Sequence, residues 1–575
     1  MIYVEFITIR RKGAELMNLD FSQIKSHFDG KAGLIAGLCQ EVNLHTIIDE
    51  HLSKKVGRPT DYPYSSLAQM MLINIADDHH PLSRLDEYFE NVDLESLLGH
   101  SINLSKLNDD RFGSFLDAMH DAGCEQIYSD IAFAAFKRYG IKISNMNFDT
   151  TSKVMWGEYQ TQDGTEGLVE ITFGYSKQKR FDKKQVKFSL GTTKGICLEG
   201  QVLSGNLDDK TYNIQNIERA KKIKDRFNPE GEDFFYIADS AAFTKECLEK
   251  AQALSVDIIT RMTDNLVAVK GEFEYVLGHM DTLETVEIKT ARKDPSLYRV
   301  HESTCRYHDI PLKMVTCYSE QLRPQKERTL KKRVLKEYSN LEKQSSALAK
   351  RSFACEEDAE LEIANLEKKE LSKLKYHNVR LFVETKEVRR RGRPSKDPSK
   401  NQTSTQFFVI MDIAADQQRI QRQLNRECLF TVASTKLTMS GPDILKEYKT
   451  QSAVERKFQF MKSTQFIDSF YLDSPKRIEA LGYLLLLLML LLSVAEYVVR
   501  RELEREKKTI IGPGKKIMDR PSMMAIYRVF YSVATASVMI GNTRQRGLSK
   551  PFKDNVSTIL RYLGIPEDIY YRGPS

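Results

Sequence analysis

Apolar residues recur at spacings of three and four through most of the first 140 residues. This period is that of a helix with one buried face. Turn-forming clusters, such as Gly57-Arg58-Pro59 and Asn108-Asp109-Asp110, separate the segments that show it. We therefore predict a helical N-terminal region over residues 1–140. Its helical segments are 31–52, 63–78, 81–99 and 111–140.

The pattern changes to alternation near Lys142. In "IKISNMNFDTTSKVMWG", Met146 and Phe148 point one way while Asn147 and Asp149 point the other, which is the period of a strand. Strand and helix patterns then follow each other as far as Met262. This order predicts an α/β fold in which helices flank a mixed sheet. The expected strands are 185–193, 196–205, 234–240 and 256–262, and the expected helices are 211–227 and 244–254.

The sheet pattern is interrupted for roughly 140 residues. Short strand-like pieces such as "GEFEYVLG" lead into a charged helical stretch from Leu322 to about Tyr376, which predicts a solvated helical pair. The polar linker "EVRRRGRPSKDPSKNQTST" follows, and strands resume with "QFFVIMDI" and "CLFTVAST". Too long for a plain loop, the interruption is predicted to be a module of its own. The predicted divisions are 1–140, 141–265, 266–404 (the insert), 405–510 and 511–575.

A leucine-rich run is the one candidate for a membrane segment. From Tyr483 it reaches Glu496 after about 13 residues, short of the roughly 20 that span a bilayer. The flank "RRELEREKK" extends the same helix into solvent. We predict a buried core helix, with a membrane or interfacial segment as the alternative.

Composition narrows the class of protein. At 575 residues the chain is too long for one core, and two to four domains are expected. The net charge of +7 permits a polyanionic partner without requiring one. Eight cysteines without a C-x-x-C pair argue against a zinc site or a disulfide framework. No signal-peptide core follows Met1. We therefore expect a cytoplasmic protein with reduced thiols.

Two aspartates stand where strands are expected to carry polar groups. Asp149 lies on the polar side of the first strand, and Asp239 closes the apolar strand "FFYIADS". A carboxylate directly after buried apolar residues is costly unless it is paired or binds a metal. The alternative for each is a helix N-cap or a strand-terminal turn.

A third carboxylate lies on the helix predicted to begin at Ser440, where S-x-x-D forms a capping box. At 100° per residue, one stripe about 60° wide carries a phenol, an amide, a carboxylate and an ammonium. An apolar strip lies beside it, although a solvated surface face gives the same pattern. The stripe is Tyr448, Gln451, Glu455 and Lys462, and the apolar strip is Val454, Phe458 and Met461.

These residues carry a resemblance to a known family. The spacing Tyr448-x2-Gln451-x3-Glu455-x6-Lys462 resembles the Y-x2-R-x3-E-x6-K signature of insertion-sequence-four-like DDE transposases. "NFDTTS" and "IADSAAFTKECLE" resemble the contexts of the first and second catalytic aspartates. "GYSKQKRFDKKQVKFSL", "LSGNLDDK" and "HHPLSRLDEYF" look like the insertion-sequence-sixteen-thirty-four branch. The resemblance covers about residues 30–570.

The resemblance implies a ribonuclease-H-like catalytic core. Asp149, Asp239 and Glu455 would hold two Mg²⁺ ions, which Mn²⁺ could replace, and hard oxygen ligands suit Mg²⁺. Tyr448 and Lys462 would contact DNA phosphates. The N-terminal helices would recognise the ends of the element, and the insert would contact DNA or a second subunit. Such enzymes act on double-stranded element ends and target DNA, as homodimers in a synaptic complex.

Two departures from the family pattern concern the grip on DNA. Gln451 replaces the signature arginine and cannot offer a charged fork to phosphate, while Arg456 and Lys457 point off the stripe. Hairpin-forming relatives hold a flipped base with an aromatic residue of the insert. The sole tryptophan, Trp156, lies near the first aspartate instead. No hairpin intermediate is predicted, although Phe273 or Tyr275 could serve.

The linker adds a second candidate contact with DNA. "RRRGRPSK", Arg389 to Lys396, resembles an AT-hook, whose arginines, here Arg391 and Arg393, lie in the minor groove of A·T-rich DNA. The alternative is a basic flexible linker, which would still add salt-sensitive affinity for DNA.

The sequence therefore favours a metal-dependent DDE transposase that cleaves and joins DNA at the terminal inverted repeats of an insertion sequence. It is expected in a prokaryotic cytoplasm, with the nucleoid when acting, and without a membrane partner. Two alternatives stay open: a ribonuclease-H-like endonuclease without strand transfer, and an inactive DNA-binding derivative.

Overall fold

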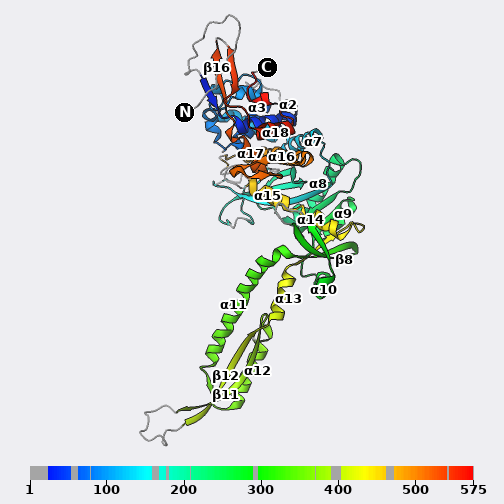
Figure 1. The fold of residues 1–575 in the computed structure, drawn as a ribbon, viewed down its shortest axis with the longest axis vertical. Helices are drawn as coiled ribbons and strands as arrows, with labels where there is room; N and C mark the ends of the chain where they lie inside the picture. The colour runs from blue at the N-terminus through cyan, green and yellow to red at the C-terminus, as the bar shows by residue number, and fades with distance from the viewer. Residues whose placement is uncertain are drawn as a thin grey trace.

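The chain folds into a body and a long arm that projects from it (Figure 1). The first and last regular elements of the described residues, β1 (Ile24–His27) and α18 (Asp554–Leu563), lie at the end of the body far from the arm. The computed structural model describes residues 24–52, 62–77, 79–157, 159, 168–176, 180–207, 209–288, 295–369, 371–389, 403–461, 470, 472–540 and 543–573.

A nine-stranded mixed sheet forms the centre of the body, which confirms the predicted α/β class and mixed sheet. Strands β2, β5 and β6 are parallel neighbours, and the other pairings are antiparallel. In spatial order the strands are β4 (Ile196–Ser204), β3 (Gln185–Thr193), β2 (Asn145–Val154), β5 (Phe235–Ala238), β6 (Asp257–Arg261), β13 (Leu429–Ser434), β9 (Ile310–Ser319), β8 (Ser296–Tyr307) and β7 (Glu284–Ile288).

The predicted alternation along β2 holds. Met146 and Phe148 are buried on one face, and Asn147 and Asp149 lie on the other. The turn between β3 and β4 has positive φ at Lys194 and Gly195, the geometry of a tight hairpin. The alternation of apolar and polar residues in the sequence therefore predicts which side chains of β2 lie on each face of the sheet.

Helices cover both faces of the sheet. On one face, α8 (Asp209–Phe227) and α9 (Lys245–Ala253) pack together, and Tyr236 donates a hydrogen bond of 2.9 Å to Asn213 of α8. The other face carries three helices in succession. They are α14 (Gly441–Lys449), α15 (Ser452–Met461) and α16 (Pro475–Glu506).

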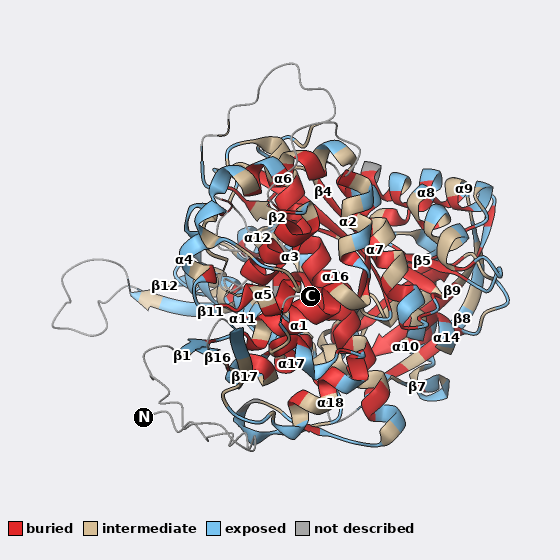
Figure 2. Ribbon diagram, turned by 90° about the horizontal axis from the view of Figure 1, so that it is seen from above, coloured by how far each residue is buried: buried red, intermediate tan, exposed pale blue. Residues whose placement is uncertain are grey.

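The far end of the body is largely helical, as the three-and-four spacing predicted. Chain-terminal segments meet there, because β1 pairs with β16 and β16 with β17. Figure 2 shows α1, α3 and α16 in the buried centre of this region. Its elements are β1 (Ile24–His27), α1 (Gly30–Glu41), α2 (Leu44–Leu52), α3 (Tyr64–Ala76), α4 (Leu85–Phe89), α5 (Leu94–Leu98), α6 (Asp109–Ala122), α7 (Cys124–Arg138), β14 (Ile510–Ile511), β15 (Ile517–Met518), α17 (Met523–Val529), β16 (Thr535–Ile540), β17 (Thr543–Leu548) and α18 (Asp554–Leu563).

The leucine-rich run belongs to α16, a helix of 32 residues that joins the sheet to the N-terminal helices. It is long and apolar enough to cross a membrane, but 94% of its most apolar window is buried inside the protein. Glycines permit this packing: a Cβ on Gly482 would lie 2.6 Å from Val202 of β4. The predicted burial of this helix is confirmed.

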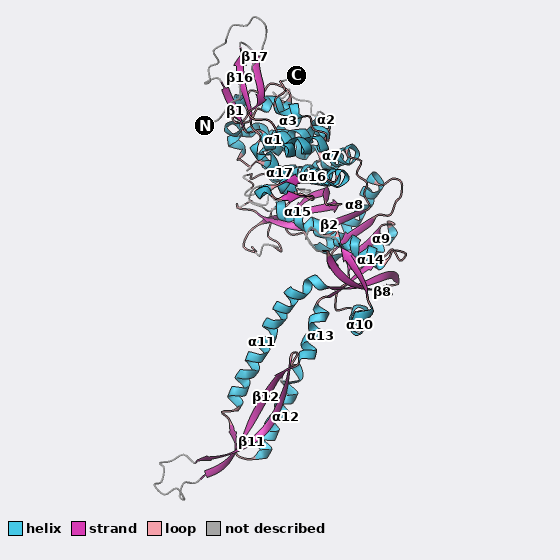
Figure 3. Cartoon of the chain, viewed as in Figure 1, coloured by secondary structure: helices cyan, strands magenta, loops and turns pink. Residues whose placement is uncertain are grey.

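The arm (residues 320–428) leaves the sheet after β9 and returns at β13 (Figure 3). Two helices lie in the charged stretch as predicted, and each packs against β12 of a three-stranded sheet ordered β10-β12-β11. The core between these layers includes Leu341, Leu348 and Met411. The elements are α11 (Arg323–Leu348), β10 (Ser352–Phe353), α12 (Glu356–Lys369), β11 (His377–Arg389), β12 (Thr403–Ala415) and α13 (Gln417–Glu427).

Three expectations about this part of the chain change. "GEFEYVLG" lies in α10 (Val267–Gly278), because Val269, Phe273 and Val276 form a buried helical stripe. Strands β7 to β9 belong to the central sheet, whereas "QFFVIMDI" lies in β12 and pairs within the arm. The segment that leaves the central sheet is therefore the arm, residues 320–428, and not the predicted insert, residues 266–404. Short strand patterns predict a strand but not its partner.

A buried carboxyl links the two ends of the chain. Asp29 is fully buried; it accepts a hydrogen bond from the backbone nitrogen of Asp93 at 2.9 Å and is hydrogen-bonded to Thr535 of β16. Burial raises the pKa of Asp29 to about 7. In the unfolded chain the same group would titrate near 3.8, so the folded state binds the proton more tightly.

This carboxyl predicts a pH-dependent stability. Its contribution is complete below about pH 4 and is lost as the pH rises through about 7, and the rise in pKa from 3.8 corresponds to at most about 4 kcal/mol. We expect Asp29→Asn, which keeps both hydrogen bonds, to lack this loss. Urea unfolding of both proteins between pH 4.5 and 7.5 measures the difference. A constant difference across that range would contradict the prediction.

Candidate active site

Two of the three predicted acids lie on neighbouring parallel strands. β2 pairs with β5 in a register that matches Asn145 with Phe235 and Asn147 with Ile237. Continuing that register by two residues places Asp149 opposite Asp239. Backbones of adjacent strands lie about 4.8 Å apart, so the two residues are neighbours at the carboxyl end of β5.

The next parallel strand, β6, carries Arg261, a residue of this site that the sequence analysis did not identify. β5 pairs with β6 so that Ala238 lies opposite Thr260, and one step further Arg261 lies opposite Asp239. Thr260 Oγ1 also donates a hydrogen bond of 2.7 Å to the carbonyl of Asp239. The Arg261 side chain is 41% exposed and pairs with Asp264 at 3.3 Å. Its position at the end of an apolar strand is the same signal that identified Asp239.

α14 packs on the face of the sheet to which these residues point. Ile444 and Leu445 share a core with Phe235 and Ile237 of β5. Ser440 caps the helix by accepting a hydrogen bond of 3.3 Å from the backbone nitrogen of Asp443, as the sequence predicted.

The last turns of α14 are tied to β2 by two side-chain hydrogen bonds. Asn145 donates to Glu447 at 2.6 Å, and Thr450 donates to Asn147 at 3.0 Å. Burial raises the pKa of Glu447. These bonds hold the end of α14 over the strand that carries Asp149.

The predicted single helix from Ser440 to Lys462 is two helices. α14 ends at Lys449 and α15 begins at Ser452. Between them, Ala453 and Val454 donate to carbonyls three residues earlier, at 2.9 and 3.0 Å, which is the tighter winding of a 3₁₀ turn. Gln451 lies in this turn. The residues before and after Gln451 therefore cannot be placed on one helical wheel at 100° per residue.

α15 carries Glu455 with its side chain exposed and packs against β2 and β3. The apolar strip is confirmed, because Val454, Phe458 and Met461 are all buried. Lys457 is buried as well and forms an ion pair with Glu496 of α16. Lys457 therefore anchors the helix and does not stand in for the missing arginine.

Tyr448 is half-buried, and nearby charges affect the pKa of its phenol. Burial raises the pKa of Tyr448 to about 12, the Arg261 charge opposes that rise, and the charges of Asp239 and Glu455 add to it. The phenol is thus close enough to sense both carboxylates and the guanidinium.

The neighbouring lysine fixes the end of α14. The Lys449 ammonium lies 4.4 Å from the ring centre of Phe430 and 4.8 Å from that of Tyr298, and burial lowers its pKa. Cations over aromatic faces are attracted by the ring quadrupole. Lys449 therefore anchors the helix turn that carries Tyr448 and is itself partly exposed.

The structure brings together Asp149, Asp239, Arg261 and Tyr448, and places Glu455 on the adjoining helix. Over the described ranges, no group of three or more His, Cys, Asp or Glu side chains lies close enough to hold a metal ion. The predicted DNA contacts at Lys462, Arg391 and Arg393 lie outside the described residues.

The aromatic residues considered for a flipped base differ in exposure. Phe273 is buried in α10 and cannot receive a base. Tyr275 is 47% exposed but stacks on His279 with ring centres 4.2 Å apart. Trp156 is 58% exposed on the surface that follows β2.

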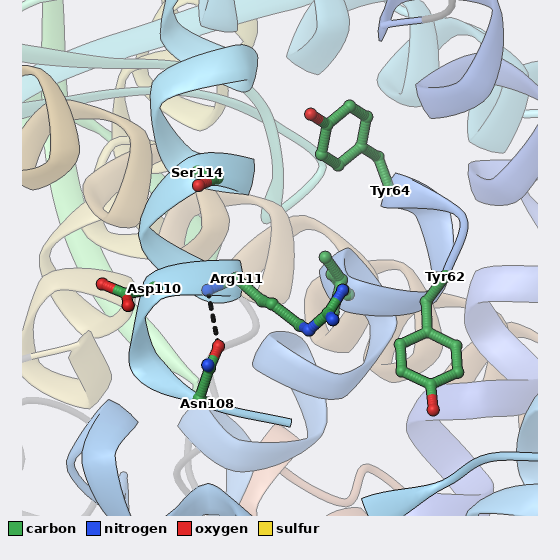
Figure 4. A pocket seen from close by; sticks show the side chains of 7 residues that line it. Tyr62, Tyr64, Asn108, Asp110, Arg111 and Ser114 are labelled. Carbon is green, nitrogen blue, oxygen red and sulfur yellow. Dashed lines mark hydrogen bonds between the residues drawn. The ribbon is translucent and has the colours of Figure 1, made fainter. Parts of the chain in front are cut away.

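A separate pocket lies between the starts of α3 and α6 (Figure 4). It encloses about 230 Å³. Asn108 caps α6 by accepting from the Arg111 backbone nitrogen at 3.1 Å. Aromatic and aliphatic side chains line it together with polar ones, and it is far along the chain from the strand-end acids. The lining residues are Tyr62, Tyr64, Leu67, Asn108, Asp110, Arg111 and Ser114.

Comparisons with known proteins identify only parts of this chain. A family described as a domain of unknown function, DUF4277, matches residues 24–133. No curated protein sequence matches the chain. Among solved structures, the piggyBac transposase in a synaptic complex with hairpin DNA, determined by cryo-electron microscopy, aligns over 88% of this chain and 82% of its own. The TM-score is 0.36, with 8% sequence identity.

Proposed function

We propose that the chain is a DDE transposase of the insertion-sequence-four-like kind, which cleaves and joins DNA at the ends of its own element. The observation that carries the proposal is the position of Asp149 on β2 and of Asp239 directly after β5, each two residues beyond the paired Asn147 and Ile237. The helix with Glu455 packs against the first of these strands. Such an arrangement fits a ribonuclease-H-like core, because that site takes its acids from strand ends and from a covering helix.

Asp149, Asp239 and Glu455 would hold the two Mg²⁺ ions. The donor set fits, since all three side chains offer the hard carboxylate oxygens that Mg²⁺ prefers. Three like charges repel one another, so we expect Glu455 to approach the two aspartates only with cations and DNA present. Two such ions would activate the attacking oxygen and stabilise the leaving one.

The remaining side chains would position DNA. Arg261 offers a guanidinium beside Asp239, and a guanidinium matches phosphate with paired hydrogen bonds. Tyr448 would donate its phenolic proton to a phosphate oxygen, because its raised pKa keeps that proton in place at neutral pH. Glu447 and Lys449 hold the helix that presents Tyr448.

The test is a reconstituted reaction on the DNA that flanks the coding region. Purified protein and Mg²⁺ should cut at terminal inverted repeats and join the 3′ ends to a target plasmid. Cutting without joining, even when pre-cut ends and target are supplied, would favour the endonuclease alternative. Binding without either reaction would favour the inactive derivative. A dimer is expected on paired ends, as light scattering of the DNA complex would show.

Arg261 provides a prediction specific to this chain. Arg261→Ala should weaken the apparent affinity for cleavable DNA about 10- to 100-fold, because a charge-assisted hydrogen bond contributes about 1.5–3 kcal/mol. Arg261→Lys should restore part of that loss, since it keeps the charge but not the fork. KM and kcat measured on end-containing DNA separate binding from chemistry.

Arg528→Ala is the matched control, because Arg528 is exposed on α17 away from the sheet. It should leave both constants unchanged. Equal effects of Arg261→Ala and Arg528→Ala would remove Arg261 from the site.

A further inference from the structure

The segment of chain that joins β2 to β3 exposes several large aromatic side chains. Trp156, Phe173, Tyr175 and Phe181 are 58%, 55%, 74% and 60% exposed; together they are called the aromatic platform. The rings of Tyr175 and Phe181 lie 6.0 Å apart. Soluble proteins expose apolar groups in clusters chiefly where something binds.

The backbone beneath part of the platform is fixed. Gln185, fully buried at the start of β3, donates from its backbone to Thr172 at 2.9 Å and from its side chain to Tyr175 at 3.2 Å. A Cβ on Gly174 would lie 2.1 Å from the carbonyl oxygen of Gly205, so only glycine permits this approach. Phe173 and Tyr175 flank this glycine, and both side chains are exposed.

The platform is also cationic. Arg180 and Lys183 lie over the Trp156 ring, 5.2 and 5.1 Å from its centre. Within residues 180–187, Arg180, Lys183 and Lys184 are basic and Asp182 is acidic, while Lys187 is buried and donates to the Leu207 carbonyl. Arg180 is partly neutralised by Asp182 at 2.8 Å. Aromatic faces interleaved with cations are what an unpaired nucleotide strand requires, because its bases stack and its phosphates need positive charge.

We propose that the aromatic platform binds unpaired bases of single-stranded DNA next to the cleavage site. This inference rests on the proposed function and specifies the form of DNA held there. Trp156 lies seven residues beyond Asp149, at most about 23 Å along an extended strand. At about 3.4 Å per nucleotide of a duplex strand, that distance corresponds to roughly seven positions. A strand separated beside the cut phosphate therefore reaches the platform.

Trp156 makes the test direct, since it is the only tryptophan of the chain. Its fluorescence is followed in the full-length protein, without divalent metal, during titration with a deoxythymidine strand of about 12 nucleotides. A duplex and an abasic strand of the same length are titrated in parallel. We expect quenching by the base-bearing strand, with an apparent Kd at least about tenfold lower than for the abasic strand.

Two outcomes overturn the proposal. Equal quenching by the abasic strand would show that charge alone is recognised. No response of Trp156 to the single strand would show that bases do not reach the platform. A signal that changes with protein concentration in the absence of DNA would assign the platform to a second copy of the chain, and would overturn it as well.

Variants separate the platform from general binding. Tyr175→Ala keeps Trp156 as the reporter and should weaken single-strand binding about 5- to 100-fold. Tyr531→Ala is the control, because Tyr531 is 77% exposed in the C-terminal region. Lys183→Gln should lower the salt dependence of binding. Equal affinities of Tyr175→Ala and the unchanged protein would contradict the stacking role.

The binding assay tests the platform and the cleavage assay tests the proposed function, so each proposal can be disproved without the other. Cleavage and joining without a fluorescence response would remove the platform and leave the proposed function standing. Base-dependent quenching in a protein that never cleaves its flanking DNA would retain the platform as a single-strand site and remove the transposase assignment.

Discussion

Replacing Asp239 with asparagine is expected to reduce metal-dependent DNA cleavage by at least about a thousandfold. Charge stabilisation by bound metal is worth several kcal/mol in the transition state, and about 4 kcal/mol is a factor of a thousand. The fold should survive, because the side chain is exposed and caps a short helical turn by accepting from the Ala241 backbone nitrogen at 3.0 Å. An asparagine oxygen accepts the same hydrogen bond.

The measurement is the single-turnover rate of nicking on end-containing DNA, with DNA affinity recorded alongside. Glu455→Gln should lose cleavage equally and retain binding, since Glu455 is exposed on α15. Asp225→Asn is the matched control, because Asp225 pairs only at the surface with Lys221 of the same helix. Cleavage by Asp239→Asn within tenfold of the unchanged protein would disprove its role. Nicking that persists in Glu455→Gln would reassign the third acid.

The second large effect concerns stability. Lys457→Met should lower the free energy of unfolding by about 3 kcal/mol, because it leaves the buried Glu496 carboxylate without its closest partner. Arg500 still pairs with Glu496 at 2.5 Å, which keeps the loss at the lower end of the range for broken buried pairs. Denaturant unfolding measures the change.

Two further variants make this prediction specific. Lys457→Met combined with Glu496→Met should recover much of the loss, because a buried pair replaced by apolar groups is often neutral. Lys508→Met removes a surface pair of 2.9 Å with Glu506 and should cost less than about 1 kcal/mol. A loss for Lys457→Met no larger than for Lys508→Met would show that the pair does not anchor α15.

The local sequence pattern was sufficient to predict an element wherever its buried residues recur at a single period. The strand through Asp149 and the strand that Asp239 closes lie within a few residues of their expected bounds, and the helix capped by Ser440 begins where expected but ends at Lys449. The leucine-rich helix was identified as core because its apolar run is too short for a bilayer and continues into charge. In each case the information lies within about 20 consecutive residues.

Pairing between distant segments required the tertiary structure. Nothing in "QFFVIMDI" distinguishes an arm strand from a central one, because both bury alternate side chains. The turn at Thr450 that divides α14 from α15 follows from the hydrogen bond of Thr450 to Asn147, some 300 residues earlier. A helical wheel contains no such long-range contact.

The sequence alone indicated the α/β class of fold, the strand through Asp149 and the strand that Asp239 closes, because apolar period and strand-end polarity are local properties. Only the tertiary structure showed that β2, β5 and β6 are parallel neighbours, so that Asp149, Asp239 and Arg261 follow their paired residues at the same end of the sheet. The same is true of the exposed aromatic platform that follows β2. Register and exposure depend on which distant surfaces meet, and that is set by packing over the whole chain.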